Sequence, residues 1–334
     1  MIFVSNNDHI SLIVTIDTEE DNWGNYDIER FSLENIQRIS GLQDIFNRFG
    51  INPTYLVTYP VATDPSSITV LKKIHESGKC EIGAHCHPWN TPPFEEQRNG
   101  HNSMLLNLST DLQIKKIKEL NQSITKSFGI QPESFRAGRW GFGKDTAFCL
   151  AQAGIKNDTS ILAFQNWSEY DGPDYSDITP KVFQITTKVG SGKNTLLEIP
   201  ASAGYSIGSF VKCNKLYKIL EQKITMKFHI KGILSRLGIL KKIWLSPETA
   251  SAAEMVILTN AMIRQGYNIL NMFFHSTALK AGLSPFVRTK DDEHLFLKKI
   301  EDYLQYLKSI GVQSIKLSDA RSIINVSSLQ ASDN

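Results

Sequence analysis

The sequence predicts an α/β protein built around a parallel β-sheet, and three observations indicate this fold. Short apolar segments rich in β-branched residues alternate with amphipathic segments that are long enough for helices. About six or seven such strand–helix units follow one another along the 334 residues. Polar residues recur directly after the apolar segments, where parallel sheets carry their functional side chains. The pattern leaves open whether the sheet is barrel-like or doubly wound.

The first unit covers residues 11–50. The run SLIVTID, residues 11–17, is short and β-branched, as expected for a buried parallel strand. The segment 32–50 predicts a helix, because Ser32 is a candidate N-cap, apolar residues recur at helical spacing and Gly50 follows the last of them.

The middle of the chain continues the alternation. The runs INPTYLVTYPVA, CEIGAH, SFRAG and IKNDTSI predict strands at residues 51–62, 80–85, 134–138 and 155–161. The amphipathic segments between them each end in glycine, the residue most typical of a helix C-terminus. They predict helices at residues 66–78, 109–129 and 144–154.

Two further units close the chain. A helix predicted at 246–266, with a proline in its first turn, leads into the strand YNILNMFFH at 267–275. A helix at 291–311 leads into the strand SIKLSDA at 314–320. Because neither a repeat nor a Gly-, Ser- or Pro-rich linker divides the sequence, we expect a single domain over residues 1–334.

Composition and charge narrow the class of protein. The chain is 41% hydrophobic and 21% charged, as in an ordinary soluble globular protein, and its net charge of +2 indicates no nucleic-acid partner. Four cysteines without a C-x-x-C pair favour a reducing compartment. The first 21 residues lack a basic region before an apolar core, so we expect no signal peptide, no membrane span and a cytoplasmic location.

Residues 205–245 are unusually basic. They contain nine Lys or Arg and one acid, Glu221, and apolar residues interleave with the cations at roughly helical spacing. This pattern predicts a basic amphipathic helical insert, for which three interpretations are open. The insert packs on the domain with its lysines in solvent, it holds an anionic substrate, or it lies on an anionic membrane surface. The last interpretation would place the protein peripherally at the inner membrane face.

Polar residues end five of the predicted strands, and this coincidence is the strongest functional signal in the sequence. The five residues are Asp17, His85, Arg136, Asp158 and His275. Because the carboxyl ends of parallel strands meet at one edge of the sheet, where loops converge on a rigid scaffold, we expect an active site there.

The acidic run TIDTEED follows the first strand. Its carboxylates, among them Asp17, Glu19 and Glu20, would be costly to bury without a cation or hydrogen bonds. One interpretation gives one carboxylate to a metal ion and another to general-base catalysis. The other interpretation is an acidic loop that caps the next helix.

The motif GAHCH places His85 and His87 on one face of a strand end, so that one ion can reach both imidazoles. With a nearby carboxylate they suit zinc or a similar divalent ion in an open catalytic site. The alternative is that they are two polar residues at the end of a strand. Cys86 points to the opposite face, and we expect it to pack in the core.

Further candidates lie at the later strand ends. Arg136, in FRAGRWGFG, can hold a carboxylate bidentately and orient a catalytic base, or it can form a structural salt bridge. His275 is a candidate general acid beside a metal site, although a single histidine is more often structural. Trp140 and Trp89 either stack on sugar rings or pack in the core.

The order of these motifs resembles that of the polysaccharide deacetylases, the NodB-homology group also called carbohydrate esterase family four. The motifs are the acidic cluster on the first strand, EIGAH, FRAG and a late strand-end histidine. The segments NDTSI, GPDYSD, LEIPAS and HSTALKAGLSPFV look like the branch found near bacterial surface-polysaccharide genes. The resemblance runs from about residue 10 to residue 320, without the basic insert.

This resemblance implies a deformed parallel (β/α) barrel of about seven strands that binds a divalent metal, usually zinc. The implied reaction is hydrolysis of an N-acetyl, occasionally O-acetyl, group on a sugar or polysaccharide precursor. In the N-acetyl case the bond that is cleaved is a carbon–nitrogen bond other than a peptide bond. Asp17 matches the family's catalytic base and Arg136 the arginine that positions it. His85 matches the first metal histidine, and His275 matches the general acid.

Two positions depart from the family pattern. Thr18 stands where the family has a second aspartate, so we assign that metal ligand to Glu19. Trp89 stands where the second metal histidine is expected, four residues after the first, so we assign that ligand to His87. His101 is the reserve candidate.

The expected substrate contacts are Trp89, Trp140, Arg139 and Asp158. Two other functions stay open at this point. One is a degenerate, non-catalytic carbohydrate-binding member of the same fold. The other is a related metal amidohydrolase that acts on a formyl-sugar or a small cyclic amide.

Overall fold

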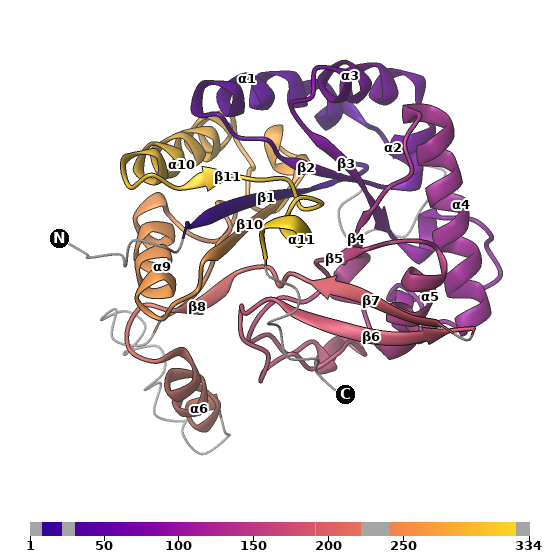
Figure 1. Cartoon of the computed structure of the whole chain (residues 1–334). Coiled ribbons are helices and arrows are strands. Elements are labelled where there is room, and N and C mark those ends of the chain that lie inside the picture. Colours follow the sequence, from indigo (N-terminus) through magenta and orange to yellow (C-terminus); the bar gives the residue numbers. More distant parts are fainter. Residues whose placement is uncertain (1–8, 22–30, 191, 222–240, 325–334) are drawn as a thin grey trace.

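The structure is a computed structural model that describes residues 9–21, 31–190, 192–221 and 241–324 (Figure 1). Seven parallel strands form a curved sheet in the spatial order β10-β1-β2-β3-β4-β5-β7. They are β1 (Ser11–Thr18), β2 (Thr54–Val57), β3 (Glu81–Cys86), β4 (Ser134–Ala137), β5 (Asn157–Asp158), β7 (Gly192–Glu198) and β10 (Ile269–His275). The remaining strands are β6 (Phe183–Val189), antiparallel to β7, β11 (Gln313–Ser314), beside β1, and the pair β8 (Ala203–Tyr205) and β9 (Lys242–Trp244).

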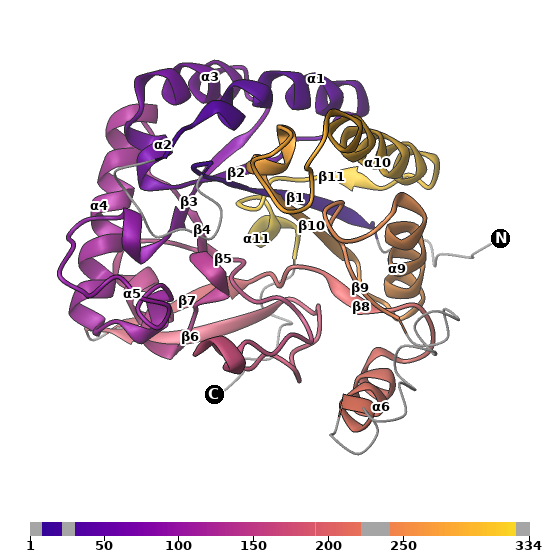
Figure 2. The ribbon, with the colours of Figure 1, turned by 180° about the vertical axis from the view of Figure 1, so that it is seen from behind.

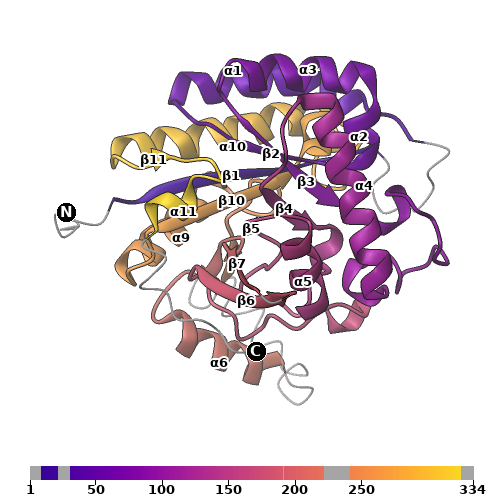
Figure 3. The same cartoon turned by 45° about the vertical axis from the view of Figure 1, so that its right-hand side comes forward.

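Helices cover the outer face of the curved sheet (Figures 1 and 2). The α-helices are α1 (Ile39–Phe49), α2 (Tyr59–Thr63), α3 (Pro65–Glu76), α4 (Thr110–Phe128), α5 (Lys144–Gln152), α6 (Phe210–Glu221), α9 (Ala252–Arg264), α10 (Lys290–Ser309) and α11 (Ala320–Ile323). Short 3-10 helices are η1 (Glu34–Arg38), η2 (Pro88–Asn90), η3 (Leu105–Asn107), η4 (Gly138–Trp140), η5 (Ser168–Tyr170) and η6 (Ser276–Leu279). Figure 3 shows α4 and α5 packed together on one flank of the sheet.

β10 and β7 stand at opposite ends of the set of parallel strands and do not pair with each other. Individual hydrogen bonds join the segments at these two ends. Ser202, in the segment after β7, donates its backbone N–H to the Asn271 carbonyl over 3.1 Å. Its Oγ accepts the Asn271 N–H at 2.9 Å. The Asn271 side chain also donates to Thr159 Oγ1 at 2.8 Å. The predicted deformed parallel barrel is thereby confirmed.

Alternation of side chains along β1 decides which residues reach the barrel interior. Leu12 and Ile16 belong to the large core between the sheet and the helices. Thr15 lies on the other face, where its hydroxyl donates to the Asn271 side chain at 3.1 Å. Asp17 shares the face of Thr15 and stands at the carboxyl end of the strand, so it opens onto the rim of the barrel.

Most predicted elements are present with shifted ends, and four features differ from the prediction. Of the strand predicted at 314–320, only Ser314 lies in a strand, β11, and Ala320 begins α11. The segment 51–62 contains a shorter strand, β2, followed by α2, which has a proline in its first turn. The helix predicted at 246–266 begins only at Ala252, where Ser251 and Glu254 form a capping box. The β6–β7 hairpin was not predicted.

The basic segment 205–245 is only partly a helix in the described residues. Its first residue ends β8, and β9 lies near its other end; these two strands pair antiparallel to each other. Between them α6 is helical and lies beyond β8, away from the main sheet (Figures 1 and 2). Residues 222–240 lie outside the described residues. None of the helices in the described ranges is both long and apolar enough to cross a bilayer.

Candidate active site

A cavity of about 590 Å³ lies at the carboxyl ends of the parallel strands. Its polar lining comprises Asp17, Glu19, Glu20, His85, His87, Arg136, Arg139, Glu248, Thr249 and His275. Its aromatic lining comprises Trp89, Trp140, Trp167, Tyr170, Trp244, Phe273 and Phe286. Nearly all of the sequence-predicted site residues therefore meet in one place, at the edge of the sheet where they were expected.

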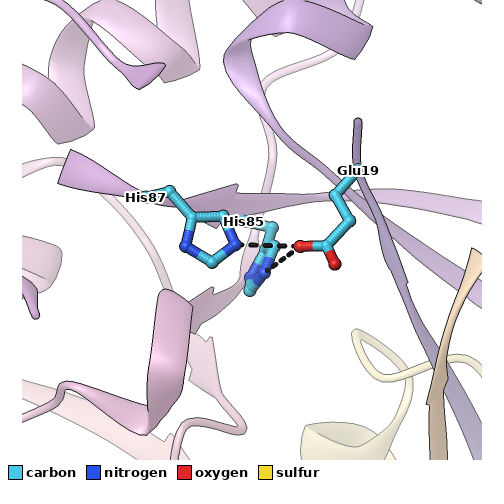
Figure 4. Close-up of side chains that lie close together, drawn as sticks. All are labelled: Glu19, His85 and His87. Atoms are coloured by element: carbon cyan, nitrogen blue, oxygen red, sulfur yellow. Dashed lines mark hydrogen bonds and ion pairs between the residues drawn. The ribbon is translucent and has the colours of Figure 1, made fainter. Parts of the chain in front are cut away.

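Three side chains of metal-ligating type form a cluster in this cavity (Figure 4). One ligand atom from each of Glu19, His85 and His87 lies within 4.8 Å of the others, and all three residues are buried. Glu19 Oε2 lies 2.9 Å from His87 Nε2 and 3.6 Å from His85 Nε2. Two imidazoles and one carboxylate, open to a cavity on one side, are a donor set that fits zinc or a similar divalent ion.

The backbone of β4 fixes the orientation of the first histidine. His85 Nδ1 lies 3.0 Å from the Arg136 carbonyl on the neighbouring strand β4. A carbonyl only accepts hydrogen bonds, so Nδ1 carries the proton and Nε2 faces the cluster as a potential ligand. Cys86, between the two histidines, packs in the core as predicted.

The ring of His87 is held between Trp89 and Gly138. The Trp89 and His87 ring centroids are 4.0 Å apart. A Cβ atom on Gly138 would lie 2.1 Å from His87 Nδ1, so only glycine leaves room for the ring in this position. Trp89, which occupies the slot of the second family histidine, thus supports His87. The reserve candidate His101 is exposed and pairs with Asp171, outside the cluster.

A buried ion pair lies beside the cluster. Arg136 Nη1 donates to Asp17 Oδ1 over 2.6 Å, and Nη2 donates to Thr15 Oγ1 over 2.6 Å. Although burial raises the pKa of Asp17, the Arg136 guanidinium and the nearby histidines hold that pKa below its ordinary value. Asp17 is therefore an ionised carboxylate, and its second oxygen, Oδ2, lies 3.6 Å from His275 Nε2.

His275 faces Asp17 with one nitrogen and Glu248 with the other. Its Nδ1 lies 3.1 Å from both carboxylate oxygens of Glu248, which also accepts the His275 backbone N–H. Burial alone would lower the pKa of His275, but the Glu248 carboxylate outweighs it and, with the acids of the cluster, raises this pKa to about 10. The ring thus holds a proton beside the cavity.

Sequence reasoning missed Glu248. The residue was assigned to the predicted helix 246–266, whereas the structure has it in the loop before α9. A signal was present: the capping box formed by Ser251 and Glu254 places the helix start after this residue. With the shorter helix, Glu248 would have been recognised as a loop acid on the site's rim.

Asp158, which we expected among the substrate contacts, does not line the cavity. It stands beside Phe135 in the parallel register, so its side chain shares the face of that core residue and not the face of Arg136. It accepts a hydrogen bond from Ser160 Oγ at 2.7 Å. It also adjoins Glu198, whose pKa is raised well above its usual range by burial and by the Asp158 charge. The other expected substrate contacts, Arg139, Trp140 and Trp89, do line the cavity.

A lysine supports the loop that follows His87. The Lys116 side chain is fully buried, and its Nζ donates to the carbonyls of Pro88, Thr91 and Pro93 over 2.7–2.9 Å. It also pairs with Glu96 at 2.9 Å. This one cation therefore satisfies three backbone oxygens and one carboxylate, and all four lose its hydrogen bonds or charge if it is removed.

Lys116→Met should lower the free energy of unfolding by about 3 kcal/mol or more, because two buried carbonyls, one part-buried carbonyl and the Glu96 carboxylate lose this donor. Urea denaturation measures this effect. The matched control is Lys115→Met, which removes an exposed ion pair with Glu95 and should cost less than about 1 kcal/mol. Equal losses in the two variants would contradict a supporting role for Lys116.

Metal binding should release a proton from the cluster. Burial lowers the pKa of His85, but Asp17 and Glu19 outweigh it and raise this pKa above its ordinary value. Burial and His85 lower the pKa of His87 to about 4, so His87 is already neutral near pH 7. A metal ion thus competes with a proton on His85 alone, and its affinity should rise with pH up to the raised pKa.

Titration calorimetry with Zn²⁺ near pH 6.5 measures the number of protons released, when it is repeated in buffers of different ionisation enthalpy. We expect the release of about one proton per ion bound. An observed heat that does not depend on the buffer would mean that His85 carries no proton to be displaced.

The fold and the site define a class: a deformed parallel (β/α) barrel with a buried, metal-site-like triad of two histidines and one glutamate at its strand ends. The same fold occurs in a protein from Mycobacterium smegmatis that is named a putative polysaccharide deacetylase. It matches 98% of this chain and 95% of its own, with a TM-score of 0.56 and 14% identity. No family model matches the sequence, and neither does any curated protein.

The same fold also occurs in an enzyme with a different name. A 4-alpha-glucanotransferase from Thermococcus litoralis matches 95% of this chain with a TM-score of 0.55 and 11% identity, and this match covers 41% of that enzyme. At such identities the likeness concerns the fold alone. What the chain does must therefore be argued from its site.

Proposed function

We propose that this protein is a metal-dependent hydrolase that removes an acetyl group from a sugar, most readily an N-acetyl group. One observation carries the proposal: a base, an acid and a metal-type cluster face one another in a single cavity. Oδ2 of the ionised Asp17 lies 3.6 Å from Nε2 of the protonated His275, and both residues lie next to the Glu19–His85–His87 cluster. The M. smegmatis protein with the same fold supports this assignment by its name.

A divalent ion bound by Glu19, His85 and His87 would polarise the acetyl carbonyl and lower the pKa of water. The protein's own groups then handle the protons. Asp17, kept ionised by Arg136, accepts the proton of the attacking water through Oδ2. Thr15, which binds the same guanidinium, keeps Arg136 in place and so fixes the direction of that carboxylate.

His275 supplies the proton that the leaving amine needs. The side chain lines the cavity with Nε2 3.6 Å from Asp17 Oδ2, while Nδ1 donates to Glu248 and so orients the ring. The aromatic lining suits the apolar faces of sugar rings, and the polar rim suits their hydroxyls. Arg139 and Trp140 have left-handed backbone conformations, with φ of 54° and 60°, and such strain in non-glycine residues is typical of functional loops.

Acetate release tests the proposal. Pure protein reloaded with Zn²⁺ should release acetate from N-acetylated sugars and should lose that activity when a chelator removes the metal. Formate release from formyl-sugars without acetate release would favour the related amidohydrolase instead. Protein that binds no stoichiometric divalent ion after reconstitution would support the non-catalytic alternative.

Glu248→Gln should shift the pH dependence of the reaction. Removing the Glu248 charge lowers the pKa of His275 from about 10, so the protonated ring is lost at lower pH. The alkaline limb of kcat against pH should therefore move to lower pH by about one unit or more. An unchanged alkaline limb, measured on folded variant, would mean that another group protonates the leaving amine.

A further inference from the structure

The helix α6 protrudes from the domain and is held to it by one side. Figures 1 and 2 place it beyond β8, at the edge of the molecule and away from the main sheet. The Phe210 ring stacks on that of Tyr267, with centroids 5.7 Å apart and 15° between the ring planes. Asn214 donates to the Ser176 carbonyl at 2.7 Å and accepts from the Tyr205 hydroxyl at 2.8 Å. These contacts define the inner side of the helix.

The opposite side of α6 combines aliphatic side chains with lysines. Its exposed residues are Val211, Lys212, Lys215, Leu216 and Ile219. At the helical period these five positions cover one continuous arc of about 140° on the helix surface. We call these five residues the outer face of α6. None of them is an acid.

Exposed apolar side chains are concentrated at this face. Twelve large hydrophobic side chains are exposed in the described residues, and four of them lie within 207–219. These four are the aliphatic residues of the outer face and Ile207, which stands just before the helix. Single exposed aliphatic side chains are ordinary, whereas a group of them on a protruding element indicates a binding surface.

The charge of the same face favours an anionic partner. Lys212 and Lys215 lie among the aliphatic side chains and form no ion pair with any residue that the structure describes. Lys218, nearer the domain, is different, because it pairs with Asp177 at 2.7 Å. The sequence of residues 222–240 adds four Lys or Arg and no acid. The outer face therefore offers cations that no neighbouring carboxylate neutralises.

A lipid bilayer matches both properties of this face. Anionic headgroups attract lysines, and the acyl chains just below them take up aliphatic side chains that leave water. Lysine suits this boundary because its apolar stem packs with the aliphatic side chains while its ammonium group reaches the headgroups. Nucleic acid would attract the lysines through its phosphates but would leave the aliphatic side chains in water. A bilayer therefore fits the outer face better than nucleic acid does.

We propose that the outer face of α6 docks the protein on the surface of a bilayer that contains anionic lipids. The helix lies in the membrane plane, with its three aliphatic side chains between the headgroups and its two lysines beside the lipid phosphates. The contact is peripheral and reversible, because the face is small and no helix in the described residues can cross a bilayer. The inference is separate from the proposed function, since no residue of the outer face lines the first cavity.

Co-sedimentation of the full chain with sucrose-loaded vesicles tests the inference. The vesicles consist of phosphatidylcholine alone, or of phosphatidylcholine with about one third phosphatidylglycerol. We expect the partition coefficient to be at least about tenfold higher on the anionic vesicles, because each lysine near such a surface adds about fivefold. Added salt should weaken this binding, because it screens the attraction between the lysines and the headgroups.

Two pairs of substitutions separate the two parts of the contact. Val211→Gln with Leu216→Gln removes aliphatic side chains and keeps the charge. Lys212→Gln with Lys215→Gln removes the charge and keeps the aliphatic side chains. Each pair should lower the partition coefficient on anionic vesicles by about tenfold or more. Because all four side chains are exposed, thermal unfolding should be close to that of the wild type in both variants.

Matched control pairs lie elsewhere on the surface. Ile257→Gln with Leu295→Gln replaces two exposed aliphatic side chains, on α9 and α10. Lys73→Gln with Lys79→Gln removes two exposed lysines, in and just after α3. Both control pairs should bind the anionic vesicles as the wild type does. Losses as large as those of the α6 pairs would show that binding follows the overall surface, and the inference would be wrong.

Other results would also overturn the inference. Equal binding to anionic and neutral vesicles, or full binding by both α6 pairs, would leave the outer face without a lipid contact. A dimer without lipid that Val211→Gln with Leu216→Gln dissociates in sedimentation-velocity runs would mean that a second copy covers the face. Tighter binding of duplex DNA than of vesicles, lost only with the two lysines, would mean a nucleic-acid partner. Acetate release is measured separately and decides only the proposed function.

Discussion

Asp17→Asn is expected to reduce kcat for acetate release by about 10³-fold or more while the protein still binds one Zn²⁺ per chain. The amide can accept the Arg136 hydrogen bond that Asp17 Oδ1 accepts now, but it cannot take a proton from water. Because Asp17 lies outside the ligand cluster, metal content should not change. Rates with an N-acetylated sugar and metal analysis of the same sample measure both effects.

Stability must be followed in this variant, because the substitution leaves the buried Arg136 without its counter-charge. Such a loss costs on the order of 3–5 kcal/mol, so thermal unfolding must show that the variant is folded at the assay temperature. Glu20→Gln is the matched control in the same cavity. Glu20 accepts hydrogen bonds from Asn90 and Thr58 and has no contact with Asp17 among those described, and an amide of the same shape keeps the Asn90 hydrogen bond through its oxygen, so it should change kcat little. Metal loss in Asp17→Asn would instead move Asp17 into the ligand set.

Gly138→Ala is expected to weaken Zn²⁺ binding by about 100-fold or more, although it removes no ligand. The added methyl group would lie 2.1 Å from His87 Nδ1, so the imidazole must turn away from Glu19. Competition with a chromophoric chelator measures the affinity. Gly143→Ala is the control, because its Cβ would lie 3.5 Å from the nearest side chain and its φ of −149° suits alanine.

A double-substitution cycle identifies the cause. If Gly138→Ala acts through His87, adding it to His87→Ala should have no further effect on affinity. Independent, additive losses would show that the methyl group acts elsewhere in the site. Unchanged affinity in both single variants would remove His87 from the ligand set.

Sequence reasoning works well where local rules decide the structure. The end of a buried parallel strand fixes where Asp17, His85 and His275 stand, and the two-residue period of β3 puts His87 on the same face as His85. The same rule failed for Asp158, which ends a strand but faces the helix side of the sheet. Its face depends on the register with β4, and the sequence of one strand does not reveal that register.

Contacts between distant segments were beyond sequence reasoning. Glu248 matters because it meets His275, and 27 residues separate the two in the chain. Gly138 shows no sign in the sequence that its missing side chain makes room for His87. Tertiary packing decides both features.

The aromatic lining of the first cavity gives the protein an optical property. Four of its five tryptophans line that cavity, namely Trp89, Trp140, Trp167 and Trp244, while Trp23 lies outside the described residues. The intrinsic fluorescence of the unlabelled chain should therefore report mainly on this cavity. Because the Trp89 ring lies 4.0 Å from that of His87, paramagnetic Co²⁺ at the cluster should quench emission that Zn²⁺ leaves bright.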